Sequence, residues 1–273
     1  MDCGTAVRVV AGEQSNLEQY AALSYCWAQN PNPQFMLLRT NQSRYADGVP
    51  IADLNNVFQD AISVCQGLST RYLWIDALCI VQGAGGDFES EASRVREIYA
   101  GSSSTIVAAS SSDPTRHFLV ERDPRPWISC KLSKAWINNT VKGCSNTHNS
   151  PSNMTVDTRG WYLQERCLSP RSIYFADRGV HWECREGIAC EDHPKIRDHR
   201  YYASDKYETL NTRYWDLLSF DSSLGGPAVA SSIRRLWWSI LPSYLTTNLS
   251  HQEDRLIIQD QRGVWPLERI DHT

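Results

Sequence analysis

The chain has 273 residues, of which 41% are hydrophobic and 21% are charged, and its formal net charge is -4 at neutral pH. This composition indicates a globular protein with a sizeable core, in one large domain or one domain with a small appendage. No block of basic residues could follow a phosphate backbone, so we expect no nucleic-acid partner. No apolar stretch reaches the roughly 20 residues of a membrane helix, and no secretion signal opens the chain, so we expect a cytoplasmic protein without a membrane partner.

The nine cysteines show neither the paired spacing of a metal site nor a disulfide framework, so we expect reduced, mostly buried thiols and no metal. The loop Gly83-Ala84-Gly85-Gly86 lacks the GxGxxG spacing and the following Lys-Ser/Thr of phosphate-binding loops. The sequence therefore predicts no bound cofactor.

The first half of the chain alternates between strand and helix patterns. An apolar segment over residues 20–27 predicts the first strand, and helical spacing of apolar residues from Leu54 to Leu68, after a cap at Asp53, predicts a helix. A strand over residues 72–81, a helix that includes Val95 and Tyr99, and a strand over residues 105–109 follow. This order predicts an α/β fold with a Rossmann-like parallel sheet.

The second half is less regular. Residues 110–156 are rich in Pro, Ser, Asn and Thr and indicate long surface connections. A short helix over residues 161–168 precedes two strands, 171–175 and 180–184, that pair around a turn. A final amphipathic helix is predicted from Ile233 to Tyr244.

Two segments define the expected domain organisation. Residues 1–190 are predicted to form the α/β domain, with an irregular, hairpin-rich part at its C-terminal end. Residues 191–273 are predicted to be a loop and helical extension that packs on the same core.

Polar side chains end the first two predicted strands, which suggests a site at the strand ends. Asp76 stands in the apolar run 72–82, where a buried carboxylate needs partners or a task, and Tyr25 and Trp27 end the run 20–27. We expect the catalytic residues Tyr25, Asp76, Glu91 and Gln164 and the substrate-binding residues Trp27, Trp74, Gln82, Trp161, Glu165, His181 and Trp182.

Each of these residues also has a structural interpretation. Asp76 can be a structural carboxylate that caps backbone amides or pairs with Arg71 or Arg166. Glu165 can pair with an arginine, and Glu91 can lie on a solvated helix face. Cysteines Cys26 and Cys79 are expected to be small buried residues rather than nucleophiles, because no histidine lies close in sequence.

A second acid/base arrangement is conceivable further along the chain. His181 and Glu183 alternate with Trp182 in a predicted strand, so they share one face. They either form an acid/base pair or lie on an exposed strand face, and the exposed face is the favoured interpretation.

The chain resembles the fungal HET (heterokaryon incompatibility) domain family in three blocks that occur in the family's order: Tyr20 to Trp27; Phe58 to Ala61 with Tyr72 to Gln82; and Arg159 to Arg171 followed by Trp182 to Cys184. The resemblance implies a Rossmann-like fold distantly related to TIR domains and a role in cell death after fusion of genetically different hyphae. By the TIR analogy it also implies NAD cleavage by a glutamate, for which Glu91 is the nearest match.

The chain departs from the family pattern in its loops. Ala28 replaces the usual glycine, the glycine loop 83–86 replaces an acidic loop, Phe88 stands where tryptophan is usual, and Val95 where methionine is common. Loop changes on a retained scaffold, in a chain that continues only briefly past the matched blocks, are expected of a protein recruited to new chemistry, and equally of a degenerate or short incompatibility protein.

Two functional hypotheses follow. The first is an enzyme of secondary metabolism that holds an apolar small-molecule substrate in an aromatic pocket and promotes a cofactor-independent cyclisation of the pericyclic, Diels-Alder type. The second is a heterokaryon-incompatibility and cell-death module that forms homo-oligomers, with NAD as the substrate of a hydrolysis through Glu91. The sequence analysis favours the enzyme.

Overall fold

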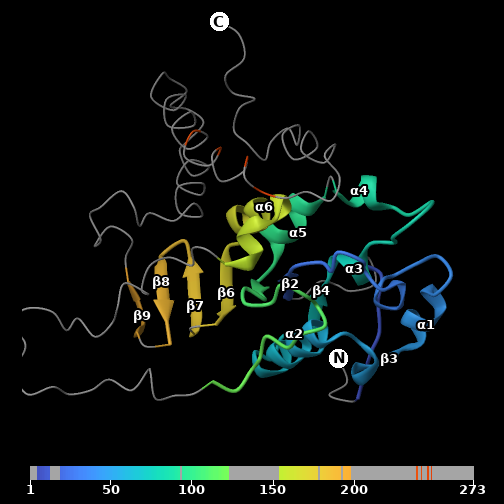
Figure 1. Cartoon of the computed structure of the whole chain (residues 1–273), viewed down its shortest axis with the longest axis horizontal. Helices are drawn as coiled ribbons and strands as arrows, with labels where there is room; N and C mark the ends of the chain where they lie inside the picture. The colour runs from blue at the N-terminus through green and yellow to red at the C-terminus, as the bar shows by residue number, and fades with distance from the viewer. Residues whose placement is uncertain are drawn as a thin grey trace, which may run out of the picture.

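The computed structural model describes residues 5–12, 19–92, 94–122, 154–177, 179–191 and 193–197, together with residues 238, 241, 245 and 247. These residues form an α/β fold around a mixed sheet, with helices on both of its faces (Figure 1). No helix in this part of the chain is both long and apolar enough to cross a bilayer.

The main sheet has seven strands in the order β4-β2-β5-β6-β7-β8-β9. Its parallel half consists of β4 (Tyr72–Trp74), β2 (Tyr20–Ser24), β5 (Ser104–Val107) and β6 (Arg171–Ala176). Its antiparallel half continues with β7 (Gly179–Cys184), β8 (Gly187–Cys190) and β9 (His193–Arg197). The predicted parallel core and the C-terminal hairpins are therefore both present.

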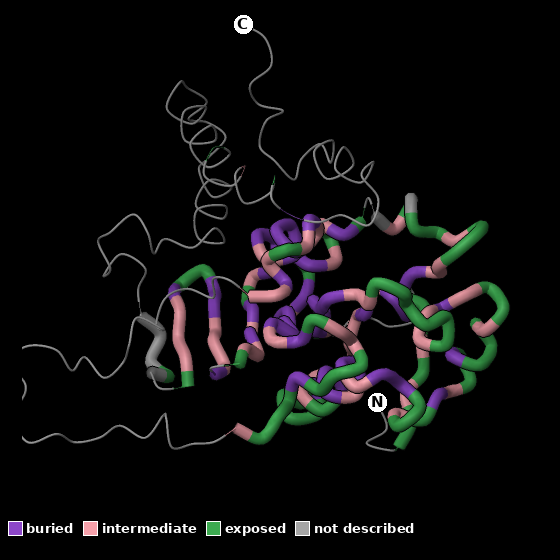
Figure 2. Tube along the Cα trace, viewed as in Figure 1, coloured by how far each residue is buried: buried purple, intermediate pink, exposed green. Residues whose placement is uncertain are grey.

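The central strand β2 is buried on both faces. Ala21, Leu23 and Tyr25 belong to the apolar core under α2 (Asn56–Gly67). Ser24 and Cys26 alternate with them and face the opposite side, where α6 (Gly160–Leu168) lies. Figure 2 shows the buried residues concentrated where the central strands meet these helices.

Helix α2 begins two residues later than the sequence predicted. Its N-cap is Asn55, whose side chain accepts a hydrogen bond of 2.9 Å from the amide of Phe58. Asp53, the predicted cap, ends the 3-10 helix η3 (Ile51–Asp53) instead. The predicted apolar face is buried except at its end, where Leu68 is 47% exposed.

The strand predicted over residues 72–81 is the clearest error. β4 ends at Trp74, and a single helical turn, α3 (Asp76–Cys79), follows. The Asp76 carboxylate accepts a hydrogen bond of 2.7 Å from the amide of Ala77. In a continuous strand that amide would be available to the backbone of a neighbouring strand. The chain becomes extended again afterwards, and Gln82 bridges to Leu38.

The remaining elements complete the two helical layers and the edge of the fold. They are α1 (Gln42–Asp47), α4 (Phe88–Ala92), α5 (Val95–Gly101), the 3-10 helices η2 (Pro33–Phe35) and η7 (Thr155–Thr158), and the small sheet of β1 (Ala6–Val7) and β3 (Val49–Pro50). The single helix expected around Val95 and Tyr99 is thus divided into α4 and α5.

Two predicted elements of the second half are confirmed, and the third falls on residues that the structure does not describe. Helix α6 and the β6–β7 hairpin match the predicted helix and paired strands. The predicted final helix, 233–244, and most of the proposed extension, 191–273, lie outside the described residues. The domain division stays a prediction.

Candidate functional site

The order of the parallel strands creates a place for a site. β2 lies between β4 and β5, so the chain crosses from β2 to β4 and then back over β2 to β5. Helix α2 lies within the first crossing and covers one face of the sheet, and α5 lies within the second crossing on the face shared with α6 (Figure 1). Helices that leave a parallel sheet on opposite faces open a crevice at the carboxyl ends of the strands.

Asp76 lies at this edge, directly after β4, and accepts three hydrogen bonds. The indole Nε1 of Trp27 donates to its Oδ2 over 2.7 Å, and the amide of Ala77 donates to its Oδ1 over 2.7 Å. The Tyr25 hydroxyl also hydrogen-bonds to this carboxylate. All three donors are neutral, so none of them cancels the charge of Asp76.

Glu165 reaches the same edge from α6. Arg159 binds it through both guanidinium nitrogens, with Nη1 3.4 Å from Oε2 and Nη2 3.2 Å from Oε1. The Ser24 hydroxyl at the end of β2 donates a further hydrogen bond to Oε2. As the sequence suggested, Glu165 pairs with an arginine. That arginine, Arg159, is the N-cap residue of α6, the helix that carries Glu165.

The charge of Arg159, which is paired with Glu165, also acts on Asp76. Burial raises the pKa of Asp76 above its usual range, and the Arg159 guanidinium and the Trp27 indole oppose this rise only in part. Burial likewise raises the pKa of Glu165, which Arg159 and Ser24 lower and the nearby charge of Asp76 raises further. One arginine cannot neutralise two ionised carboxylates, so the cluster retains an affinity for a proton.

The same charges keep Arg159 ionised. Burial alone would lower the pKa of its guanidinium, but the charges of Glu165 and Asp76 hold that pKa above its ordinary value. We call Ser24, Tyr25, Trp27, Asp76, Arg159 and Glu165 the acid–arginine cluster.

The cluster extends from the interior to the surface. The Glu165 side chain is 5% exposed, whereas that of Arg159 is 18% exposed. Asp76 and Trp27 are half-buried, and Tyr25 is buried. Solvent or a ligand can therefore reach the side chains of Asp76 and Arg159. The buried carboxylate of Glu165 fixes Arg159 through their ion pair.

Four of the predicted site residues, Tyr25, Trp27, Asp76 and Glu165, thus belong to the cluster. Gln82 adjoins it, because its side-chain amide donates to the backbone oxygen of Asp76 over 3.3 Å. Neither Arg71 nor Arg166, the partners first considered for Asp76, takes that role. Arg71 lies over the ring of Tyr72, and Arg166 binds Glu183.

Three further predicted residues lie on neighbouring elements and make other contacts. Trp74 meets the ring of Tyr99 edge to face, with the ring centroids 5.6 Å apart. Trp161 meets Phe88 in the same way at 6.4 Å. Glu91, on α4, is paired with the exposed Arg94 at 2.9 Å.

His181 and Trp182 do not belong to the cluster. They lie on β7, three strands from β2, which corresponds to about 14 Å at ordinary strand spacing. Trp182 is aligned with Ile173 and His181 with Tyr174.

Glu183 corrects the sequence interpretation of that strand as an exposed face. Glu183 is only 1% exposed. Its Oε2 accepts hydrogen bonds from the Tyr174 hydroxyl and from Arg166 of α6. The predicted site residue Gln164, also on α6, is 1% exposed.

Ser24 and Arg159 were not among the site residues predicted from the sequence. Both stand in the quoted family blocks, and a buried carboxylate on α6 requires a cation, so Arg159 could have been inferred from the need to neutralise Glu165. Of the two cysteines considered as nucleophiles, Cys26 is buried as expected and Cys79 is half-buried. Burial raises the pKa of Cys79 to about 11, so its thiol stays protonated at neutral pH.

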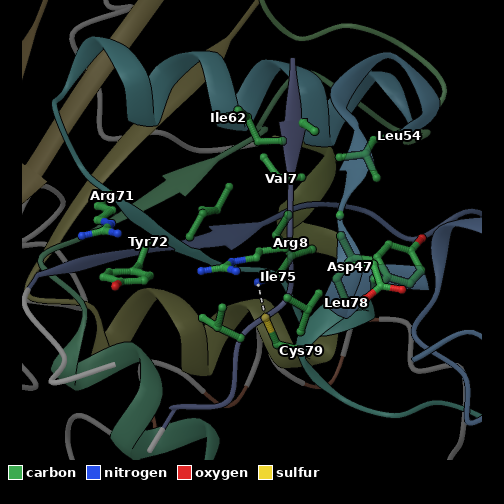
Figure 3. A pocket seen from close by; sticks show the side chains of 16 residues that line it. Val7, Arg8, Asp47, Leu54, Ile62, Arg71, Tyr72, Ile75, Leu78 and Cys79 are labelled. Atoms are coloured by element: carbon green, nitrogen blue, oxygen red, sulfur yellow. Dashed lines mark hydrogen bonds between the residues drawn. The ribbon is translucent and has the colours of Figure 1, made fainter. Parts of the chain in front are cut away.

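A pocket of about 480 Å³ lies on the other side of α3, and its lining does not include Tyr25, Asp76 or Trp161 (Figure 3). The aromatic substrate pocket expected around those three residues is therefore not this one. In the described part of the chain, no group of three His, Cys, Asp or Glu side chains is arranged to hold a metal.

A family model described as heterokaryon incompatibility protein (HET) matches residues 20–165, from the first residue of β2 to Glu165. The chain belongs to the HET family. The match includes every member of the acid–arginine cluster. HET domains are linked to heterokaryon incompatibility and cell death. Neither a curated protein nor a solved structure matches the chain significantly.

Proposed function

We propose that this HET protein acts in heterokaryon incompatibility as a cell-death module, and that the acid–arginine cluster is its functional site. The observation that carries the proposal is that Arg159 pairs with Glu165 while its charge also lowers the pKa of Asp76, at the strand ends where parallel sheets bind ligands. Both carboxyl pKa values lie above their usual range, as is typical of acid/base sites.

In this proposal Asp76 moves the proton and Arg159 binds the substrate. Asp76 is half-buried and held by neutral donors, so its charge is the less compensated of the two. A ligand with an anionic group would take the accessible end of Arg159, because a guanidinium binds carboxylate or phosphate through two parallel hydrogen bonds. Ser24 and Glu165 would position Arg159 without touching the ligand.

NAD is the substrate to test first. It carries the phosphates that Arg159 could bind, and by the TIR analogy its cleavage uses a carboxylate. The family analogy assigns this task to Glu91, but the ion pair between Glu91 and Arg94 at the surface makes Asp76 the stronger candidate. If this protein cleaves NAD as the TIR analogy implies, we propose that Asp76 supplies the catalytic carboxylate.

The cyclisation hypothesis receives less support. It needs an apolar cavity around the reacting substrate, whereas Asp76 is surrounded by polar atoms: the indole N–H of Trp27, the amide of Ala77 and, nearby, the charge of Arg159. Membership of the HET family also favours the cell-death role.

The cell-death role is tested by induced expression in a fungal host, with viability compared among the wild type, Asp76→Asn, Arg159→Lys and Glu91→Gln. We expect the wild type to kill, Asp76→Asn and Arg159→Lys to be harmless at equal protein levels, and Glu91→Gln to retain killing. Killing by Asp76→Asn at wild-type strength would refute the role of the cluster.

The chemistry is tested separately with purified protein and NAD, by measuring nicotinamide release. Release that is lost in Asp76→Asn and kept in Glu91→Gln supports the assignment to Asp76. The reverse pattern supports Glu91. Killing without nicotinamide release would keep the cell-death role and remove NAD as its substrate.

A further inference from the structure

We propose that the pocket beside β4 binds a small apolar molecule that ends in one carboxylate group. The pocket lies between the small β1–β3 sheet, α2, β4 and α3, and its volume is about 480 Å³. This volume is within the range of roughly 300–1,000 Å³ that is usual for small-molecule sites. The proposal does not depend on any activity of the acid–arginine cluster.

The body of the pocket is apolar. Leu54 and Ile62 contribute from the α2 side, and Ile75 and Leu78 from the α3 side, and all four are at least 94% buried. Val7 and Val9 add half-buried aliphatic surface from the opposite wall. Side chains of this kind favour a hydrocarbon ligand, because each buried methylene contributes about 0.8 kcal/mol to transfer from water.

Two arginines give the pocket one charged end. Arg8 and Arg71 are exposed lining residues, and among the residues the structure describes neither has a carboxylate partner. The Arg71 guanidinium lies 5.5 Å from the centre of the Tyr72 ring, which holds it beside the pocket. In Figure 3 both guanidinium groups lie toward the Tyr72 side, and Asp47 lies on the opposite side.

This distribution selects the ligand class. A neutral hydrocarbon would leave both arginines without a partner, and a cation would be repelled by them. A carboxylate can bind the two guanidinium groups while its chain fills the apolar body.

The test is isothermal titration of the whole chain with dodecanoate below its micelle concentration, and with dodecanol as the neutral equivalent. We expect one dodecanoate per chain and binding of dodecanol that is about 10-fold weaker or more, since two partly exposed ion pairs contribute up to about 5-fold each. The double variant Arg8→Ala/Arg71→Ala should lose the same factor for dodecanoate and none for dodecanol. Absence of saturable dodecanoate binding would overturn the proposal.

Two further variants separate the pocket from general charge effects. Arg185→Ala removes an exposed arginine from the distant β7–β8 turn and should bind as the wild type does. Val9→Trp fills part of the pocket and should weaken both ligands, with circular dichroism confirming that the variant is folded. An equal loss in Arg185→Ala, or an unchanged affinity in folded Val9→Trp, would place the binding elsewhere and refute the assignment.

Discussion

The indole of Trp27 donates a hydrogen bond of 2.7 Å to the carboxylate of Asp76, 49 residues further along the chain. This bond joins the segment that follows β2 to the first residue of α3, and so connects the first two of the three family blocks. It also stabilises the ionised form of Asp76 against the effect of burial. The balance between these two effects determines when Asp76 can hold a proton.

Replacement of Trp27 by phenylalanine should raise the pKa of Asp76 further, because the carboxylate loses one of its three donors. The loss should destabilise the protein by about 1–3 kcal/mol at a pH at which the carboxylate is ionised, and by less in acid. Carbon-13 NMR of the Asp76 carboxyl group and urea unfolding measure the two effects. Trp74→Phe is the matched control, since Trp74 contacts Tyr99 rather than Asp76, and an equal shift in that variant would contradict the assignment.

Removal of Arg159 should cost far more than removal of a surface arginine in a similar pair. Arg159→Ala leaves Glu165 buried without a cation, and we expect a loss of about 3–5 kcal/mol in the free energy of unfolding at neutral pH. Arg94→Ala breaks a pair in which the arginine is 61% exposed, and it should cost less than about 1 kcal/mol. Similar losses in the two variants, by urea unfolding, would show that Glu165 is not held as described.

The acid–arginine cluster should make the protein less stable as the pH rises. The folded-state pKa of Asp76 lies above the unfolded value of about 3.9, so the folded protein binds more protons between these two values. The stability that Asp76 contributes is therefore complete below the unfolded pKa and is lost as the pH rises through the folded pKa. Above that pKa the contribution is constant.

The measurement is the free energy of unfolding from about pH 4 to about pH 8, in the wild type and in Asp76→Asn. The wild type should lose stability more steeply with rising pH than the variant, which lacks the raised pKa of Asp76 but keeps that of Glu165. Parallel curves would mean that Asp76 has no raised pKa in the folded protein.

Asp60 should be essential for the loop that follows β5. Its Oδ2 accepts the amides of Phe118 and Leu119 at 2.7 and 2.9 Å, and its Oδ1 lies 2.8 Å from Nδ1 of His117. Asp60→Ala should cost about 1–3 kcal/mol, because the buried amide of Phe118 loses its acceptor. Asp113→Ala, which removes a hydrogen bond from a more exposed turn, should cost less. Urea unfolding compares them, and an equal cost would contradict this role.

The sheet was predictable because the local sequence of its strands and turns indicates them directly. The run from Ala21 to Cys26 is short and largely apolar, and every residue in it is buried. The hairpin of β6 and β7 was predictable from its turn, and Gly179 indeed has a positive φ of 148°. Local patterns of this kind need no knowledge of the rest of the chain.

The interruption after Trp74 could not be predicted in the same way. Ile75, Ile80 and Val81 favour a strand, and the helical turn between them depends on the partners that Asp76 finds in Trp27 and Tyr25. The site was predictable to the same extent: its strand-end members carry a local signal, whereas Arg159 is identified only by the carboxylates that surround it.

Helix α3 has consequences out of proportion to its four residues. One side of this turn supplies Leu78 and Cys79 to the pocket beside β4, and its first residue supplies the carboxylate of the acid–arginine cluster. A molecule that displaces this turn from one side would therefore also shift the other side. Thermodynamic reciprocity then requires that each ligand alter the affinity of its counterpart by an identical factor.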